Sequence, residues 1–408
     1  PIKLVEGFKV KKFKKAMALG LVFAMCATIA AGCGNDNKQQ QQPQADGADK
    51  QQQQAADEIF IGGLSPLTGD LAVYGTANTK GAEMAFKEIN AAGGINGAQI
   101  KFDTQDEKGD ATEAVNAYTK LLDAGVVAIL GDVTSAPCAA VADASAADNM
   151  PCITATGTAA DITTYGENYF RVCFTDPLQG KTMATFAADN LEAKTAAILY
   201  NVSSDYSDGL KTAFVKQAKE KGLTIVAEES YADQDKDFKA QLTTIAGQKP
   251  DVLFIPDYYS KVSLIANQAK AVGCEAVLLG ADGWDGVMET LDASAADVVE
   301  GAYFCNHYSA EDENPVVQNF IKNYKEAYNE TPNAFAALGY DAAYILAEAI
   351  EKAGSTDSQA IIDALAATEH EGVTGKISFD ANGDPVKSLT IIKIVDGKYT
   401  FDSTVLAE

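Results

Sequence analysis

Short apolar runs alternate with helix-like periodic segments from residue 58 onward. Residues 59–64 form one such run, which predicts a buried strand. Residues 79–90 carry Ala82, Ala85 and Phe86 at helical spacing, which predicts a helix with one apolar face. Four further strands of this first series are predicted at 100–103, 126–130, 152–154 and 169–174.

A second series of the same kind follows Pro177. Strands that alternate with helices form parallel sheets with helices on both faces. Two such series in succession therefore predict two similar Rossmann-like lobes. The strands of the second series are predicted at 196–200, 224–227, 252–255, 277–280 and 301–305.

The last quarter of the chain is mostly helical in pattern. Apolar spacing predicts helices around 317–324, 344–349 and 361–365, followed by strands at 376–379 and 389–395. Helices that are not followed by strands of their own must pack on a sheet formed earlier in the chain. We therefore expect the chain to cross back between the lobes. The predicted fold class is α/β, with two lobes of parallel sheet joined by a multi-strand hinge. The predicted lobes are 58–175 plus 309–375, and 176–308 plus 376–408.

The N-terminal segment has the pattern of an export signal. Residues 9–15 contain five lysines, residues 16–31 carry no charge, and small residues precede Cys33. This pattern predicts a secretory signal over 1–32. The small residues before Cys33 resemble a bacterial lipobox, and the resemblance implies lipidation of Cys33. A plain signal peptide and an uncleaved anchor helix stay open as alternatives.

Residues 33–57 are rich in glutamine and almost free of apolar side chains. Such a segment cannot bury enough surface to offset the entropy of ordering it, so it predicts a disordered tether. Together with a lipidated cysteine, the tether predicts an exported protein anchored at the outer face of a bacterial cell membrane.

The composition of the chain argues against several classes of function. The chain has 32 Lys+Arg, 57 Asp+Glu and a net charge of −25, which argues against a nucleic-acid partner. With two histidines and a single arginine, Arg171, the chain also lacks the residues for a His-rich metal site or an arginine cluster. The sequence contains no GxSxG or HExxH motif, and no GxGxxG follows the first strand. We therefore expect neither an enzyme nor a cofactor or metal.

The cysteines and histidines do not form a recognisable catalytic or metal-binding motif. Five cysteines follow Cys33, so at most two disulfides can form among them, and their pairing stays open. A bridge between Cys138 and Cys173 is one pairing that their expected positions in the first lobe allow. His307 follows a predicted strand near a crossing, and we expect it to be a hinge or surface residue. The five cysteines are Cys138, Cys152, Cys173, Cys274 and Cys305.

Hydroxyl-rich segments follow two strands of the first series. Ser135 comes after strand 126–130, and Thr156-Gly157-Thr158 comes after strand 152–154. Ligands of open α/β sheets bind beyond the carboxyl ends of the strands. The hydroxyls and a helix N-terminus at Ser135 could therefore hold an anion such as a carboxylate. A helix N-cap at Ser135 and an ordinary polar turn at 156–158 are the alternatives.

Several longer motifs then point to one family. The chain resembles the leucine/isoleucine/valine-binding proteins, which are type I periplasmic solute-binding proteins that feed ABC importers. The resemblance covers the chain from about residue 58 to its end. It is carried by Ser65-Pro66-Leu67-Thr68-Gly69, Tyr74-Gly75, Glu88-Ile89-Asn90-Ala91-Ala92-Gly93-Gly94-Ile95-Asn96-Gly97, residues 131–135, Phe170-Arg171, Asp205-Tyr206, Gly339-Tyr340-Asp341-Ala342 and residues 389 onward.

The resemblance implies a Venus-flytrap fold and an amino acid held between the lobes. It places the ligand's carboxylate at Ser135, Thr156 and Thr158. It places the α-amine at Asp282, where the best-known relatives have a glutamate. The implied aromatic contacts are Tyr206 and Tyr258 from the second lobe, with Tyr74 and Phe335 at the ligand's side chain. Trp284 has no clear counterpart; its place two residues after Asp282 suggests the cleft, and local packing is the alternative.

These implied roles lead to one expected function and several rivals. We expect a monomer that delivers a branched-chain amino acid to the permease and ATPase subunits of an ABC importer. An aromatic or polar amino acid and a small amide remain alternative ligands. A ligand sensor domain and an exported hydrolase remain alternative functions.

Overall fold

The computed structural model describes residues 58–291 and 295–405, so the predicted signal (1–32) and tether (33–57) lie outside the described residues. The strands of the first series form one parallel sheet in the order β2-β1-β3-β4-β5. This confirms the predicted first sheet. Its strands are β1 (Ile59–Ser65), β2 (Ile100–Asp106), β3 (Ala128–Leu130), β4 (Cys152–Thr154) and β5 (Tyr169–Arg171).

Helices cover both faces of this first sheet. Helices α2 (Ala111–Asp123) and α3 (Ser135–Asp148) pack on one face, where Leu64 and Ile129 point. On the other face lie α1 (Ala72–Ala91), α10 (Ala334–Ala353) and α11 (Ser358–Ala366). A short helix, η1 (Ile162–Thr164), precedes β5.

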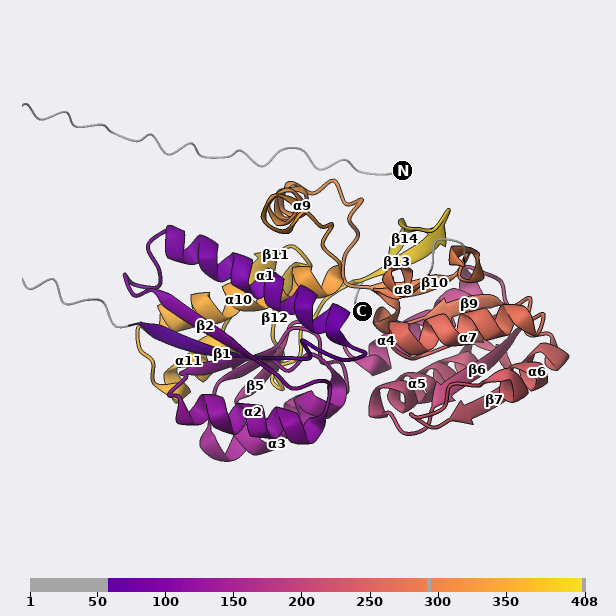
Figure 1. Cartoon of the computed structure of the whole chain (residues 1–408), viewed down its shortest axis with the longest axis horizontal. Helices are drawn as coiled ribbons and strands as arrows, with labels where there is room; N and C mark the ends of the chain where they lie inside the picture. Colours follow the sequence, from indigo (N-terminus) through magenta and orange to yellow (C-terminus); the bar gives the residue numbers. More distant parts are fainter. Residues whose placement is uncertain (1–57, 292–294, 406–408) are drawn as a thin grey trace, which may run out of the picture. The chain divides into compact units, whose positions relative to one another are not determined.

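Helices α1 and α10 pack closely although they are far apart in the sequence, and Figure 1 shows them side by side. Glycines allow this approach. A Cβ atom on Gly81 would lie 2.0 Å from the Ala336 carbonyl oxygen, and one on Gly339 would lie 2.3 Å from the Asn78 carbonyl oxygen. Only glycine fits at both positions, so the return of the chain onto α1 depends on them.

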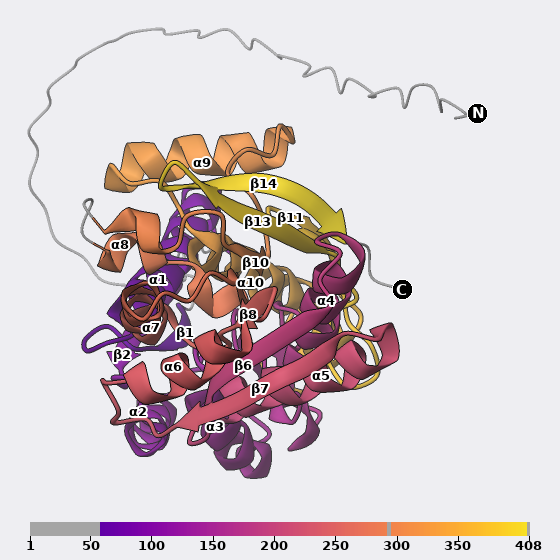
Figure 2. The same ribbon diagram turned by 90° about the vertical axis from the view of Figure 1, so that its right-hand side faces the viewer.

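The second sheet has seven strands in the order β14-β13-β10-β9-β8-β6-β7. Strands β6 to β10 are parallel, whereas β13 and β14 form an antiparallel hairpin at one edge, opposite β7 (Figure 2). The strands are β6 (Thr195–Asn201), β7 (Thr224–Tyr231), β8 (Val252–Phe254), β9 (Val277–Gly280), β10 (Tyr303–Asn306), β13 (Leu389–Val395) and β14 (Lys398–Val405).

Helices also cover both faces of the second sheet, which completes the predicted α/β fold with two lobes. Helices α4 (Asp176–Asp189) and α5 (Asp205–Lys221) share one core with the sheet, and α6 (Lys239–Gln248) and α7 (Tyr259–Ala271) share another. The remaining helices are α8 (Val287–Thr290), α9 (Pro315–Tyr328), η2 (Asp282–Trp284) and η3 (Ala296–Val298).

The chain passes between the two sheets three times, after β5, after β10 and before β13. These crossing segments contact one another. Arg171 forms an ion pair with Asp384 at 2.5 Å, and the Lys387 ammonium donates to the Val172 carbonyl at 3.3 Å. Burial lowers the pKa of Lys387 to about 8. Phe174 of the first crossing stacks on His307 of the second, so the crossings form one connected bundle rather than three separate linkers.

A small hairpin of β11 (Glu369–Gly372) and β12 (Gly375–Ser378) precedes the third crossing. Its Ile377 packs into the core of the first sheet. The predicted lobe boundary between residues 375 and 376 would cut this hairpin in two. The lobe boundaries as a whole stay a prediction.

Some predicted elements differ from the structure. Helix α1 begins at Ala72, whereas the prediction began it at residue 79. Its first two turns bury Tyr74 and Ala77 against residues of the second lobe, so they do not continue the apolar face that packs on the first sheet. The apolar pattern did not predict strand β14, which follows the last predicted strand at 389–395. Within residues 58–291 and 295–405, no helix combines the length and the hydrophobicity needed to cross a membrane.

The contact between α1 and α10 gives a stability prediction. Gly81→Ala should lower the free energy of unfolding by about 1–3 kcal/mol, because the added methyl group must push the Ala336 carbonyl away. The control is Gly247→Ala in α6, where nothing lies within 4 Å of the added methyl group and where alanine should stabilise the helix by up to about 1 kcal/mol. Urea unfolding followed by circular dichroism compares the two; equal stability changes would contradict the packing argument.

Candidate functional site

The carboxyl ends of strands from both lobes face one another across a small pocket. Its free volume is about 10 Å³, roughly the room for one water molecule. An amino acid can therefore enter only when the lobes move apart. The pocket is lined by Val133, Thr134, Ser135, Thr156, Thr158 and Phe335 from the first lobe and its helices, and by Tyr206, Tyr258, Asp282 and Gly283 from the second.

The first lobe offers hydrogen-bond donors at the N-terminus of α3. Ser135 begins this helix, and its hydroxyl accepts a hydrogen bond from the Ala159 amide at 3.2 Å. The preceding Thr134 hydroxyl is buried and has no hydrogen-bond partner among the described residues. The positive end of the helix dipole and unpaired donors favour an anion here.

A network of hydroxyls shapes the adjoining loop. The Thr156 hydroxyl donates to the Val133 carbonyl at 2.7 Å, which ties the loop after β4 to the loop after β3. Thr154 accepts from the Gly157 amide at 2.8 Å and donates to the Asp132 carbonyl at 2.6 Å. The two predicted hydroxyl segments thus form one continuous wall.

The single arginine supports this wall from behind. Arg171 is fully buried and donates to the carbonyls of Gly157 and Ala159 at 3.2 and 2.8 Å. Its ion pair with Asp384 links the same loop to the third crossing. Arg171 therefore positions the loop instead of contacting the pocket.

The pairing of Cys138 with Cys173, which the sequence left open, does not form in the structure, because both thiols are free and make other contacts. Cys173 donates to the Gly157 carbonyl at 3.1 Å, and Cys138 lies 3.5 Å from the Thr154 hydroxyl. The other three cysteines are free thiols as well.

The second lobe places a buried carboxylate opposite this wall. Asp282 begins η2, directly after β9, and only 3% of it is exposed. Its Oδ1 atom accepts from the Tyr206 hydroxyl at 2.7 Å and from the Gln179 amide at 3.0 Å. Its Oδ2 atom lies 3.2 Å from Nε2 of His307. Burial raises the pKa of Tyr206 well above its usual value, so its hydroxyl stays a neutral donor.

Aromatic rings form the remaining walls. Tyr206 and Tyr258 stack with centroids 4.6 Å apart, and Tyr74 stacks on Phe335 at 4.0 Å. Tyr74 does not line the pocket itself; its hydroxyl donates to the Gly283 carbonyl, behind Phe335. Burial raises the pKa of Tyr258, and the Ser135 backbone N–H that hydrogen-bonds to its hydroxyl opposes the shift. Tyr258 and Ser135, at the N-terminus of α3, line the same pocket from opposite lobes.

Two predicted positions are corrected. Trp284 does not line the pocket, because its indole is fully buried and donates to the Ile255 carbonyl at 2.8 Å. His307 was expected at the hinge or on the surface; it lies at the start of the second crossing and is not a surface residue, since only 4% of it is exposed and its ring contacts Asp282. The remaining predicted residues, apart from Tyr74, line the pocket together.

Sequence reasoning missed Gln179 and Asp176 at the start of α4. Gln179 also accepts from the Asp282 backbone amide at 2.9 Å, so it fixes both the main chain and the side chain of that residue. Asp176 is buried, and burial together with the nearby Asp282 raises its pKa, although a hydrogen bond with Thr158 lowers it. One feature of the sequence, Gly180 in α4, relates to their placement. A Cβ atom added at Gly180 would lie 2.6 Å from the Leu210 carbonyl oxygen, so α4 can lie this close to α5 only with glycine there. This close approach of α4 and α5 brings the start of α4 to the site.

A wider cavity of about 570 Å³ adjoins the pocket and shares Thr134, Ser135, Tyr206 and Tyr258 with it. Its rim is polar and comes from both lobes, with Asp70 on one side and Asp233 on the other. The pocket thus opens to solvent along the line between the lobes, which gives a ligand its path.

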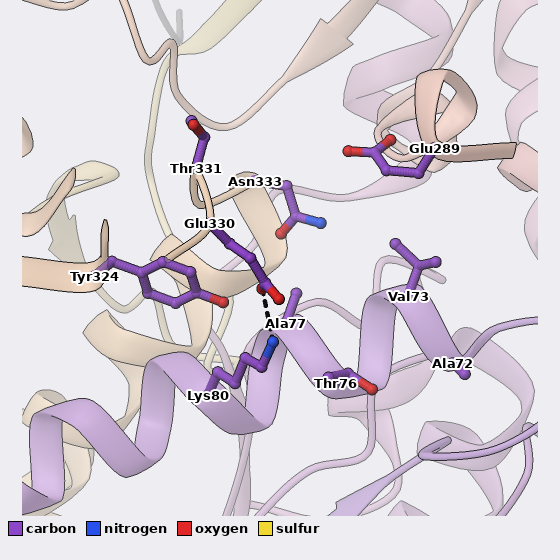
Figure 3. A pocket seen from close by; sticks show the side chains of 10 residues that line it. All are labelled: Ala72, Val73, Thr76, Ala77, Lys80, Glu289, Tyr324, Glu330, Thr331 and Asn333. Atoms are coloured by element: carbon purple, nitrogen blue, oxygen red, sulfur yellow. Dashed lines mark hydrogen bonds and ion pairs between the residues drawn. The ribbon is translucent and has the colours of Figure 1, made fainter. Parts of the chain in front are cut away.

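A second large cavity, of about 580 Å³, lies beside α1 (Figure 3). Lys80 on α1 points across it to Glu330, with which it forms an ion pair at 2.6 Å, while Glu289 lies apart on the opposite side. Among the residues that the structure describes there, no set of buried polar groups converges on one point. The small pocket between the lobes is therefore the better candidate site.

Comparisons with known proteins agree with this geometry. The family model described as "Periplasmic binding protein" matches residues 58–398. A Leu/Ile/Val-binding protein homologue of Brucella melitensis is 31% identical over 348 residues, covering 84% of this chain and 92% of the relative.

Two solved structures are also similar. A leucine-binding protein from Thermotoga maritima is 33% identical with a TM-score of 0.79, over 85% of this chain and 99% of that one. A branched-chain amino acid transporter substrate-binding protein from Streptococcus pneumoniae, solved with isoleucine, is 33% identical with a TM-score of 0.79, over 86% and 99% of the two chains. These relatives are binding proteins and not enzymes, and the chain belongs to the periplasmic binding protein family.

Proposed function

We propose that this chain is the substrate-binding component of an ABC importer and that it binds a free amino acid between its lobes. The observation that carries the proposal is the opposition of two kinds of group across one pocket. Hydroxyls and a helix N-terminus at Ser135 face the carboxylate of Asp282. A zwitterion needs both, because burying either charged end without a partner would defeat binding.

The proposed contacts follow from this opposition. Ser135, Thr156 and Thr158 meet the ligand's carboxylate, and Asp282 meets its ammonium group. The apolar faces of Tyr258 and Phe335 then lie against the ligand's side chain, with Tyr74 behind. Aromatic faces offer apolar area and no charge, which favours an aliphatic side chain. Leucine, isoleucine and valine are the lead ligands, as the names of the relatives also suggest.

The proposal extends to delivery. Members of this family act outside the cytoplasm, and we propose that the loaded, closed form docks on a permease whose ATPase subunits drive import. The lobes close over the ligand by motion about the three crossings. We further propose that Cys33 is lipidated, that residues 33–57 form the tether, and that the folded part works as a monomer.

The first prediction concerns ligand class. Calorimetry with the twenty amino acids should give the tightest binding for leucine, isoleucine or valine. The control ligand is 4-methylpentanoate, which keeps the leucine skeleton but lacks the amine, and it should bind far more weakly because Asp282 is left unpaired. No heat from any amino acid would refute the proposal, and equal binding of the control would refute the role of Asp282.

The second prediction concerns the assigned site. Ser135→Ala and Asp282→Asn should each weaken leucine binding by about 1–3 kcal/mol, because each removes a group that pairs with one charged end of the ligand. Asp123→Asn, at the exposed end of α2, is the matched control and should bind as the unaltered protein does. Unchanged affinity in both site variants would show that the ligand binds elsewhere.

The third prediction concerns the anchor. Cys33→Ser should release the protein from the membrane fraction into the soluble extracytoplasmic fraction, because lipid can no longer be attached. Immunoblots of fractionated cells measure this, with Cys274→Ser as the control that keeps the anchor. Membrane retention of both variants would indicate an uncleaved anchor helix instead.

A further inference from the structure

His307 connects the candidate site to the segment that joins the lobes. It follows β10 directly, at the start of the second crossing, and its side chain is 1% exposed. Its Nε2 atom lies 3.2 Å from Asp282 Oδ2. The ring also stacks on Phe174 of the first crossing, with centroids 3.7 Å apart and planes 16° from parallel. The imidazole is therefore held in two ways, by packing and by one hydrogen bond.

The surroundings of the ring favour a neutral imidazole. Burial is the largest influence and lowers the pKa of His307 to about 4; the hydrogen bond and charge of Asp282 raise it, and the charge of Lys387 lowers it. These are the charged groups that face the ring, from η2 and from the third crossing. The Nδ1 atom is buried and has no partner among the described residues, so a proton there would be unsatisfied. The proton of the neutral ring therefore belongs on Nε2, from which it can be donated.

All the side-chain donors to Asp282 that the structure describes are then neutral. They are the phenol of Tyr206, the amide of Gln179 and the imidazole of His307. Neutral donors orient a carboxylate and lower the cost of burying it, but they leave its charge uncompensated. The ammonium group of a ligand is the cation that this arrangement lacks.

We infer that His307 is a positioning residue for ligand binding: as the neutral Nε2–H tautomer it holds Asp282 Oδ2 and leaves the carboxylate's charge to the ligand's ammonium group. The inference rests on the proposed function, because it takes Asp282 as the partner of that group. It also connects Asp282 to the crossings, since the same ring packs on Phe174.

The binding experiment compares three variants by calorimetry with leucine. His307→Leu fills the space but removes the donor, and it should lower affinity about ten- to hundredfold. His307→Gln can place an amide N–H near the position of Nε2 and should restore most of that loss. His370→Gln is the matched control, because the ring of His370 contacts Glu348 and does not line the pocket. Equal affinity of His307→Leu and His370→Gln, with leucine still bound, would overturn the inference and leave the proposed function standing.

The second measurement uses the ligand-free protein, so it decides the protonation of His307 even if no amino acid binds. The chain has only two histidines, which simplifies assignment of their ¹⁵N NMR signals. His307 should show the Nε2–H tautomer and should not titrate between pH 8 and about 5, because its pKa is lowered to about 4. His370 should titrate with a raised pKa: burial is the largest single influence and lowers it, but the hydrogen bond to Glu348 and the charges of Asp341 and Glu348 together outweigh burial. A cationic His307 at neutral pH, or a proton on Nδ1, would refute the inference.

Discussion

The site depends on one buried carboxylate that the protein holds but does not neutralise. Asp282 is almost fully buried, and its side-chain hydrogen bonds come from Tyr206, Gln179 and His307. Removing a carboxylate from water is expensive unless a cation or several donors replace the lost hydration. The donors replace part of the lost hydration, but the side-chain donors that the structure describes bring no cation to the carboxylate. In the proposed function, the ligand's ammonium group is that cation. Much of the second lobe's architecture, from the start of α4 to the end of β10, serves to bring these donors to one point.

The first lobe presents hydrogen-bond donors to the pocket, opposite the carboxylate of the second lobe. Its donors are a helix N-terminus and hydroxyls, which are fixed by Thr154 and by the buried Arg171. Neither lobe alone presents a site for both ends of a zwitterion. Ser135 of the first lobe and Tyr258 of the second line the same pocket, and only a water-sized space remains between the two walls. In the proposed function, a ligand therefore reaches both walls only when the lobes move apart.

The sequence pattern predicted the sheets well, because buried parallel strands appear as continuous apolar runs. Residues 152–154, 277–280 and 389–395 were predicted with the observed bounds. Strand β14 was missed because an edge strand carries few buried apolar residues, although Asp396-Gly397, both with positive φ, is a strong hairpin signal.

The pocket hydroxyls could be located from the rule that ligands bind at the carboxyl ends of strands. His307 and Gln179 could not, since they reach Asp282 from 25 and 103 positions away through tertiary packing alone. The three crossings have a consequence of a different kind. Each lobe is assembled from separated stretches of the gene, so no single contiguous fragment encodes a complete lobe. A single crossover between the genes of two relatives would therefore not exchange one whole lobe for another.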